Sequence, residues 1–203
     1  MVVLGCIAAP AWADTIAVTN PSFEITNPLT FTAPGAGSWN AGPIPGWTIT
    51  GGGAGSWQPG PALFNLPVPD GNTVAYSNGA TLSQTLSASL APNTTYTLSA
   101  FVGHRLDGDV TNYTIALLAG GTILSSLSGS NGVIPLGTFQ NEVFSFTSGA
   151  TVPSGNLGIA LFSNGIQTDF DNVQLTASPV PEPGSLALLA TGLGLMFFVF
   201  RRR

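Results

Sequence analysis

Apolar and polar positions alternate with a period of two through most of the chain. The clearest run covers residues 96–102, in which the even-numbered positions are Tyr, Leu, Ala and Val. Because the side chains of a strand point alternately to its two faces, this period predicts half-buried β-strands. The same period recurs over residues 113–117 and 157–161. We expect further strands at residues 73–77, 81–86, 122–127, 142–147 and 170–176.

Turn signals separate these segments. Asn78-Gly79, Gly120-Gly121 and Asn164-Gly165 supply the positive φ angles that tight hairpins need. About ten short strands with no helical crossover between them favour an all-β, antiparallel β-sandwich. Proline and glycine are concentrated in residues 27–65, so we expect long loops there.

The C-terminal segment follows a different pattern. Residues 185–200 carry no charge over sixteen positions, and Arg201, Arg202 and Arg203 follow them. A helix of this length would span ~24 Å at ~1.5 Å per residue, slightly less than the ~30 Å hydrocarbon core of a bilayer. The arginine side chains can snorkel to the interface, and their charge keeps that end in the cytoplasm. We therefore predict one transmembrane helix, with the body of the chain on the outer side of the membrane.

The tripeptide Pro181-Glu182-Pro183 stands just before that hydrophobic segment. Together with the helix and the arginine cluster, it resembles the PEP-CTERM sorting signal of Gram-negative bacteria, which we assign to residues 179–203. The resemblance implies recognition by an exosortase, a membrane-embedded protease that cuts near the Pro-Glu-Pro motif. The body would then pass from an inner-membrane intermediate, in which it faces the periplasm, to the cell surface or the extracellular medium.

The N-terminal residues indicate export as well. Residues 2–9 form a short apolar run, and Ala11-Trp12-Ala13 places small residues at the two positions that signal peptidase reads. We therefore assign residues 1–13 to a signal peptide and residues 14–178 to one β-sandwich domain. A basic region before the apolar run is missing, which indicates that the true start lies upstream. Val3-Leu4-Gly5-Cys6 offers an alternative, a lipoprotein cleavage box, which Leu4 fits poorly.

Charge is scarce and unbalanced. Only 6% of residues are charged, there is no lysine, and Arg105 is the only permanent positive charge between the two targeting segments. Eight carboxylates between Asp14 and Asp171 stand against it. Nucleic-acid affinity depends mainly on lysine and arginine, so this composition excludes nucleic-acid binding. Apolar residues make up 44% of the chain and include 12 Phe, which is enough to bury a core.

Three short motifs occur in order along the body. They are Asn20-Pro21-Ser22-Phe23-Glu24, Ile44-Pro45-Gly46-Trp47 and the closing segment 170–175. These motifs resemble galactose-binding-like jelly rolls, a group that includes carbohydrate-binding modules and DUF642-like domains. The resemblance implies a structural calcium ion beside the first and last strands, held by Glu24 and Asp171. Alternatively, these two carboxylates only accept backbone N–H groups at strand ends.

Sugar-binding sites combine an aromatic ring, which stacks on the sugar, with polar groups that bind its hydroxyls. The glycan-binding candidates are Trp57 and Tyr76 as stacking rings, with Arg105 and Asp107 as polar ligands. His104 and Arg105 are adjacent, so in a regular strand they point to opposite faces and cannot both line one pocket. The ordinary alternative is that the rings belong to the core and the charges are solvated.

Catalytic chemistry finds little support in the sequence. His104 is the only histidine, no Gly-x-Ser-x-Gly elbow is present, and no His/Cys cluster offers a zinc site. Asp107 and Asp109 could imitate the paired carboxylates of a glycan hydrolase, yet alternate residues share a face in any strand. We therefore expect a non-enzymatic, exosortase-processed surface or extracellular-matrix protein that binds exopolysaccharide through its sandwich. The alternatives are a purely structural biofilm component without a ligand pocket and, more remotely, a glycan hydrolase.

Overall fold

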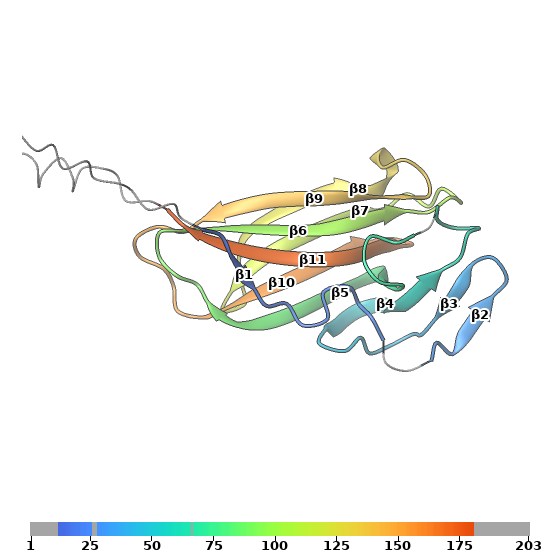
Figure 1. Cartoon of the computed structure of the whole chain (residues 1–203), viewed down its shortest axis with the longest axis horizontal. Coiled ribbons are helices and arrows are strands. Elements are labelled where there is room, and N and C mark those ends of the chain that lie inside the picture. Colours follow the sequence, from blue (N-terminus) through green and yellow to red (C-terminus); the bar gives the residue numbers. More distant parts are fainter. Residues whose placement is uncertain (1–11, 26–27, 66, 181–203) are drawn as a thin grey trace, which may run out of the picture.

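The computed structural model describes residues 12–25, 28–65 and 67–180, which form an antiparallel β-sandwich (Figure 1). This confirms the all-β, antiparallel fold class. The apolar run of the signal peptide, the Pro-Glu-Pro motif and the predicted transmembrane helix lie outside the described residues. Within the three described ranges, no helix is long and apolar enough to span a membrane.

Eleven strands and one short 3₁₀ helix, η1 (Asn131–Val133), make up the described part. The strands are β1 (Asp14–Ile16), β2 (Phe31–Ala33), β3 (Gly37–Trp39), β4 (Thr48–Pro59), β5 (Val74–Ser89), β6 (Thr94–His104), β7 (Asn112–Ala119), β8 (Thr122–Ser130), β9 (Thr138–Thr147), β10 (Asn156–Asn164) and β11 (Thr168–Pro179).

The long strand β5 belongs to both layers of the sandwich. Its first residues pair with β11, for example Ala75 with Phe170, and its last residues pair with β10, for example Leu82 with Leu161. The strand bends at Gly79, whose φ is +70°, and β4 pairs with it on both sides of the bend. One layer is therefore β4-β5-β10-β7-β8, and the other is β11-β6-β9 with β1 added to β11.

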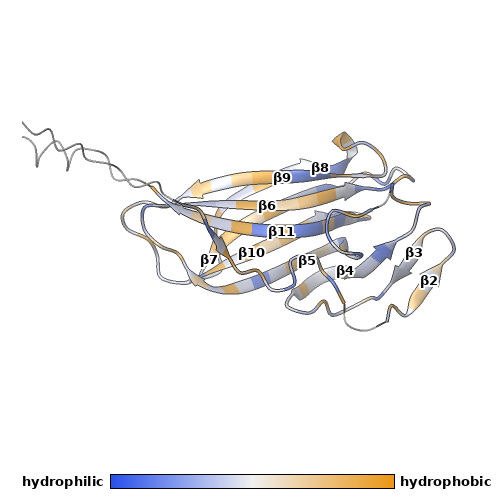
Figure 2. Cartoon of the chain, in the orientation of Figure 1, coloured by the Kyte–Doolittle hydropathy of each residue, from blue (hydrophilic) through white to orange (hydrophobic). Residues whose placement is uncertain are grey.

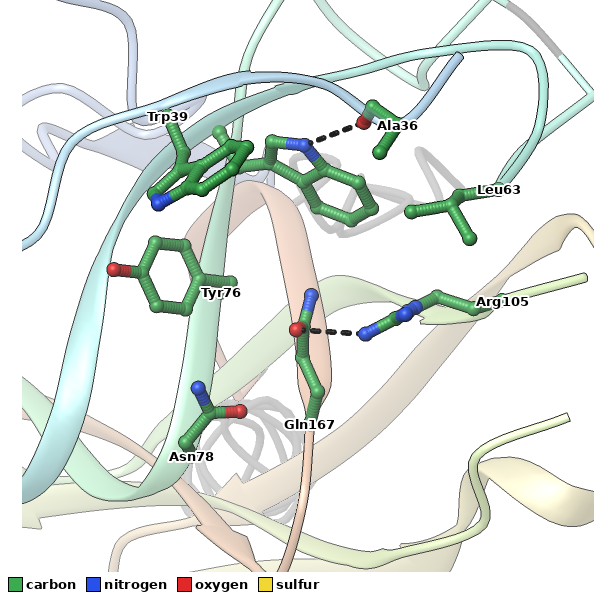
Figure 3. A pocket seen from close by; sticks show the side chains of 8 residues that line it. Ala36, Trp39, Leu63, Tyr76, Asn78, Arg105 and Gln167 are labelled. Carbon is green, nitrogen blue, oxygen red and sulfur yellow. Dashed lines mark hydrogen bonds between the residues drawn. The ribbon is translucent and has the colours of Figure 1, made fainter. Parts of the chain in front are cut away.

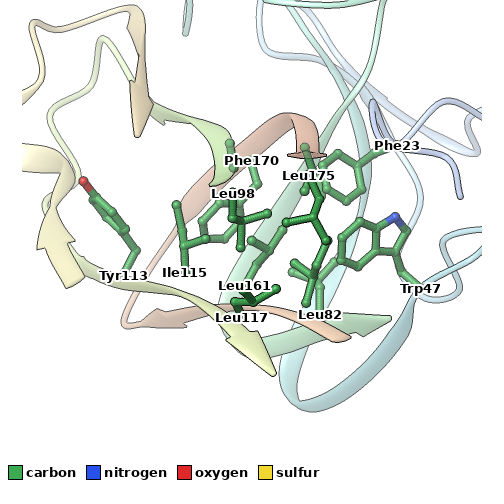
Figure 4. Packing of buried hydrophobic residues seen from close by; sticks show 14 of the residues in the cluster. Phe23, Trp47, Leu82, Leu98, Tyr113, Ile115, Leu117, Leu161, Phe170 and Leu175 are labelled. Atoms are coloured by element: carbon green, nitrogen blue, oxygen red, sulfur yellow. The ribbon is translucent and has the colours of Figure 1, made fainter. Parts of the chain in front are cut away.

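The alternating apolar positions face the space between the layers. The four even-numbered residues of 96–102 are all buried, none more than 2% exposed. Apolar side chains from facing strands fill the interior (Figure 4), and polar residues alternate with them along the strands (Figure 2). Burial of this apolar surface stabilises the sandwich by roughly 25 cal/mol per Å².

Two sequence-based expectations need correction. Segments 73–77 and 81–86 are not separate strands, because both belong to β5, and Asn78-Gly79 forms the bend within it. The expectation of long loops over residues 27–65 holds for residues 40–47 and 60–65, and it is wrong for the rest, because β2, β3 and the twelve-residue β4 occupy this segment. The glycine-rich sequence of β4 shows no alternation, yet its pairing with β5 along both halves of the bend holds it extended.

The chain enters and leaves the body at the same end. Asp14, the first residue of β1, pairs with Ala177 near the end of β11. The backbone N–H of Val180 donates to the carbonyl oxygen of Asn93 (2.8 Å). The loops that follow β6 and precede β11 make up the opposite end (Figure 1), and the candidate site lies there.

Candidate functional site

A pocket of about 290 Å³ opens near the start of β11. It lies beside a small apolar cluster of Trp57, Phe64, Val68 and Val74, which is separate from the main core. The volume suits one small ring-shaped molecule. The lining residues are Ala36, Trp39, Trp57, Leu63, Tyr76, Asn78, Arg105 and Gln167 (Figure 3).

Two tryptophans and a tyrosine form one wall of the pocket. Trp39 of β3 stands directly opposite Trp57 of β4 in the sheet register. The Trp57 indole N–H donates to the carbonyl oxygen of Ala36 (3.0 Å), which fixes the orientation of the ring. Tyr76 of β5 pairs with Gly55, and a Cβ on Gly55 would come within 3.0 Å of the Tyr76 ring. The missing side chain therefore gives the Tyr76 ring its place beside β4.

Arg105 forms the other wall. It directly follows β6, and its guanidinium carbon lies 5.9 Å from the centre of the Trp57 ring. One guanidinium nitrogen donates to the side-chain oxygen of Gln167 (2.9 Å) and lies 3.5 Å from Asp109. The other terminal nitrogen donates to a carboxylate oxygen of Asp107. The only arginine of the body is thus fixed in the pocket wall by two carboxylates and by the Gln167 amide, whose contact with Arg105 is drawn in Figure 3.

A fully buried carboxyl group lies behind Gln167. The side-chain N–H of Gln167 donates to Oδ1 of Asp169 (2.7 Å), whereas Oδ2 has no hydrogen-bond partner within the described part of the chain. In the sheet register, Asp169 stands between Tyr76 and Gly103. Two phenylalanine rings cover Gly103, stacked with their centres 4.5 Å apart. This apolar cover separates the carboxyl group from water.

Burial raises the pKa of Asp169 to about 7. The hydrogen bond from Gln167 and the positive charge of Arg105 lower this pKa, and the charges of Asp107 and Asp109 raise it. A carboxyl group with such a pKa is partly protonated at neutral pH and can donate a proton. A buried acid of this kind beside a pocket is typical of functional sites.

Three of the four glycan-binding candidates meet in the pocket. Trp57, Tyr76 and Arg105 line it, and Asp107 lies beside it through its contact with Arg105. His104 is only 4% exposed, its Nδ1 lies 2.6 Å from the carbonyl oxygen of Ile134, and it is not among the residues that line the pocket. Glycan binding by these residues stays a prediction.

Sequence reasoning missed Gln167 and Asp169. The local sequence does not reveal which strands lie beside Asp169, and its importance comes from its place between β5 and β6. A signal was nevertheless present. Gln167, Asp169 and Asp171 occupy alternate positions at the start of the last strand, a pattern that places three polar side chains on one face.

The calcium candidates lie at a different turn. Glu24 accepts two backbone N–H groups of residues 70–73, each at 2.8 Å. Asp171 accepts the backbone N–H of Asp70 (2.9 Å) and that of Asn172 (2.7 Å). Burial raises the pKa of Asp171 to about 7, and the charges of Asp70 and Glu24 add to the rise. The structure thus brings Glu24 and Asp171 to one turn. Both carboxylates accept backbone N–H groups there, as expected if they serve only to hold the strand ends.

The fit of this turn to calcium is partial. No group of three or more His, Cys, Asp or Glu side chains in residues 12–25, 28–65 and 67–180 is placed to hold a metal ion. A calcium ion would have to use the lone pairs that Glu24 and Asp171 keep after these hydrogen bonds, with backbone carbonyls completing its six to eight ligands. Calcium at this turn stays a prediction.

Comparison with known protein families gives two matches, one to the body and one to the C-terminal segment. Residues 14–176 match the family described as HpiC1-like (HpiC1 cyclase). Residues 179–203 match the PEP-CTERM protein-sorting motif, which confirms the sorting signal predicted there. No curated protein sequence matches the chain.

Solved structures similar to this chain include cyclases from Fischerella sp. TAU. One, in complex with 4-(1H-indol-3-yl)butan-2-one, is 29% identical, with a TM-score of 0.70 and coverage of 82% of this chain and 98% of that one. Another cyclase from the same organism is 30% identical, with a TM-score of 0.69 and coverage of 83% and 98%. The carbohydrate-binding module TmCBM61, in complex with beta-1,4-galactotriose, is 14% identical at a TM-score of 0.51, with coverage of 79% and 97%. That last likeness concerns the fold alone.

Proposed function

The chain belongs to the HpiC1-like cyclase family, and from this premise we propose that its body binds a small ring-shaped organic molecule in the aromatic pocket. The PEP-CTERM sorting signal implies export and placement at the cell surface or outside the cell. We include in the proposal that an exosortase processes the chain, that residues 185–200 cross the inner membrane beforehand, and that the sandwich is a galactose-binding-like jelly roll.

The size and walls of the pocket carry this proposal. Its volume of about 290 Å³ is at the lower end for small-molecule sites, so it suits a single or fused ring better than a stretch of polysaccharide. Trp39 and Tyr76 offer flat apolar faces, and Gln167 and Arg105 offer polar groups. A pocket with convergent polar groups also disfavours the alternative of a purely structural matrix component without a ligand site.

A neighbouring groove supports a ligand with a short side chain. This groove of about 470 Å³ shares Tyr76 and Asn78 with the pocket and is otherwise lined by Trp47, Ile49 and small residues. A ring between Trp39 and Tyr76 could therefore extend an apolar substituent past Tyr76. The indolyl butanone bound by the Fischerella cyclase, a fused aromatic ring with a four-carbon chain, has this shape.

A binding experiment tests the pocket. The full chain is titrated with 4-(1H-indol-3-yl)butan-2-one and, separately, with glucose and galactose, and tryptophan fluorescence and calorimetry report binding. We expect saturable binding of the indole compound, weakened about tenfold in Trp39→Ala because one aromatic face is lost. Val143→Ala, an exposed position of β9, is the matched control and should bind normally.

Two outcomes would contradict this proposal. If none of the probes binds, or if binding is unchanged in Trp39→Ala, the pocket is not the site. If the sugars bind and the indole compound does not, the pocket is a glycan site of the kind predicted from Trp57, Tyr76 and Arg105.

The buried acid favours a second candidate function, an acid-catalysed cyclisation. Asp169 lies behind Gln167 and does not itself line the pocket, so this candidate requires the Gln167 side chain to move aside when the ligand binds. Asp169 would then donate its proton to a carbon–carbon double bond of the ligand, and a second double bond of the ligand would attack the resulting cation and close a ring. Loss of a proton from the neighbouring carbon to Asp169 restores the acid, so the product is an isomer of the substrate. The observation behind this candidate is a carboxyl group that is fully buried and fixed by Gln167 through Oδ1, and whose Oδ2 has no hydrogen-bond partner among the described residues.

Product analysis tests the second candidate. The chain is incubated with indoles that carry an unsaturated side chain, and mass spectrometry and NMR detect products of unchanged mass. We expect Asp169→Asn to abolish the product while the affinity for the indole butanone is retained. Equal product formation by Asp169→Asn would remove Asp169 from the chemistry, and no product from any substrate would support the sequence-based expectation of a non-enzymatic protein.

A further inference from the structure

Phe162 is exposed on a strand of the layer that does not contain β11. It is the third residue from the C-terminal end of β10 and lies between Leu161 and Ser163, both of which are fully buried, while Phe162 itself is 37% exposed. A single exposed apolar side chain is ordinary on a protein surface. The residues around it therefore decide whether it has a role.

The side chains beside Phe162 all carry hydroxyl groups. Thr81 of β5 and Thr114 of β7 stand directly opposite Phe162 on the two adjacent strands. One strand further out lie Thr50 of β4 and Ser128 of β8, and the hydroxyls of Thr114 and Ser128 are 2.8 Å apart. The five side chains form one row across five strands, which at a strand spacing of ~4.8 Å extends over ~19 Å.

The adjacent rows on this face are also uncharged. A hollow of about 350 Å³ lies over Phe162 and is lined by threonine, serine and two asparagines, with no charged residue among its seven lining residues. The row on one side consists of Asn164, Asn112 and Ser130. The row on the other side consists of Thr48, Ser83, Ala160, Ala116 and Ser126.

An exposed aromatic ring surrounded by uncharged hydroxyl and amide groups fits a neutral sugar better than other ligand classes. Nucleic acids and anionic lipid surfaces are held by lysine and arginine, which this face lacks. A stable interface with a second copy needs a buried apolar centre, whereas here a single ring is surrounded by polar groups. Neutral sugars have an apolar C–H face that stacks on aromatic rings, and hydroxyls that exchange hydrogen bonds with Thr, Ser and Asn side chains.

We propose that the face centred on Phe162 binds a neutral polysaccharide that lies across β5, β10 and β7. Phe162 stacks on one sugar ring, Thr81 and Thr114 bind its hydroxyls, and Asn112 and Asn164 bind those of a neighbouring sugar. The site is separate from the aromatic pocket, because the hollow beside Phe162 and the pocket share no lining residue. The length of the row suits a polymer, and the chain is exported to a place where such polymers occur.

Affinity electrophoresis of the full chain tests this site. Gels contain hydroxyethylcellulose, xylan, laminarin or galactan as neutral probes, and alginate as an anionic probe. We expect at least one neutral polymer to retard the chain, with a dissociation constant about tenfold higher for Phe162→Ala because the stacking contact is lost. Thr114→Asp, which leaves Phe162 in place, should weaken binding as well, and Phe162→Tyr should retain it.

Controls separate this face from the pocket and from self-association. Trp39→Ala in the pocket and Val143→Ala on the other layer should leave retardation unchanged. Retardation by none of the neutral probes, or by alginate alone, overturns the proposal. So does a loss of retardation in Trp39→Ala with normal retardation of Phe162→Ala. Sedimentation at several concentrations completes the test, because a dimer that dissociates in Phe162→Ala would make this face an interface between copies.

Discussion

At the scale of single residues, the buried carboxyl group of Asp169 makes the stability of the fold depend on pH. Its folded-state pKa of about 7 lies above the ordinary value of 3.8, so the folded protein binds this proton more tightly than the unfolded chain. The stability that this proton confers is complete below about pH 4 and is lost as pH rises towards 7. Above neutral pH, folding has to bury a charge that lacks a full set of partners.

Asp169→Asn should therefore stabilise the protein at pH 8. The amide keeps an acceptor for the Gln167 N–H and carries no charge, and the shift corresponds to a gain on the order of 2–4 kcal/mol in the free energy of unfolding. Urea unfolding from pH 4 to pH 9 measures this free energy. Between pH 4 and pH 7 it should fall less in the variant than in the original protein. Asp171 accounts for the remaining decline, because its pKa is raised in the same direction.

The control for this prediction is Asp14→Asn. Asp14 is exposed at the opposite end of the body, and its replacement should leave the pH profile unchanged. An Asp169→Asn variant that is less stable than the original at pH 8 would contradict the assignment of a raised pKa to burial.

The residues of the site could be predicted only where their side chains alone suggest binding. Trp57, Tyr76 and Arg105 were predicted because large rings, and the single arginine of a body with few charges, are the residue types expected in a binding site. Gln167 and Asp169 were not found, since their role arises from a hydrogen bond to each other and from the strands on both sides. Register across a sheet is a long-range property that no local pattern encodes.

At the scale of elements, β4 depends on a glycine where another backbone approaches. A Cβ on Gly55 would overlap the carbonyl oxygen of Asn40 and come within 3.0 Å of the Tyr76 ring. Gly55→Ala should therefore lower the free energy of unfolding by ~1–3 kcal/mol and weaken binding of the indole compound, because the pocket wall shifts. Denaturant unfolding and the fluorescence titration measure the two effects.

Gly53 of the same strand provides the matched comparison. A Cβ on Gly53 meets nothing within 4 Å, so Gly53→Ala makes the same chemical change without a clash. It should leave the free energy of unfolding close to normal, so the comparison between the two variants is made on stability. Equal losses in both variants would show that the backbone freedom of glycine, rather than the space at Gly55, is what β4 requires.

The turn at residues 70–73 is the element at which calcium is tested. An ion bound there would offset the repulsion among Glu24, Asp70 and Asp171, and a ligand at a hundred times its dissociation constant stabilises by ~2.7 kcal/mol. We expect a higher melting temperature in millimolar calcium than in chelator, and no such difference in Asp171→Asn. The same melting temperature in calcium and in chelator would contradict the calcium prediction, and these carboxylates would then only accept backbone N–H groups.

The strands differ in how well their local sequences predict them. β6 has regular alternation because one face lies on the core and the other on solvent, and its prediction from residues 96–102 is confirmed. β4 reads as a loop because glycine offers no pattern, and β5 reads as two strands because Gly79 interrupts it. In both, pairing with neighbouring strands overrides the local signal.

At the scale of the whole molecule, the two termini of the described body lie at the end opposite the pocket. Asp14 and Val180 mark the end where the chain enters and leaves, and Gln167 and Arg105 mark the other. β11 connects the two ends with twelve residues, which at ~3.3 Å per residue amounts to roughly 40 Å. The pocket therefore lies about one strand length from Val180, the last described residue, which belongs to the sorting signal.

This arrangement gives a prediction about processing. Replacement of Pro181-Glu182-Pro183 by three alanines should leave the full-length chain in the membrane fraction, because the protease loses its recognition motif while residues 185–200 stay apolar. Immunoblots of membrane and extracellular fractions, with mass spectrometry of the C-terminus, measure the outcome, and Thr151→Ala with Pro153→Ala at the same end of the body is the control. The retained chain should still bind the indole compound from the periplasmic side, because the fold and the distant pocket are unchanged. Release of the triple-alanine chain at normal size and amount would show that the Pro-Glu-Pro motif does not direct its sorting.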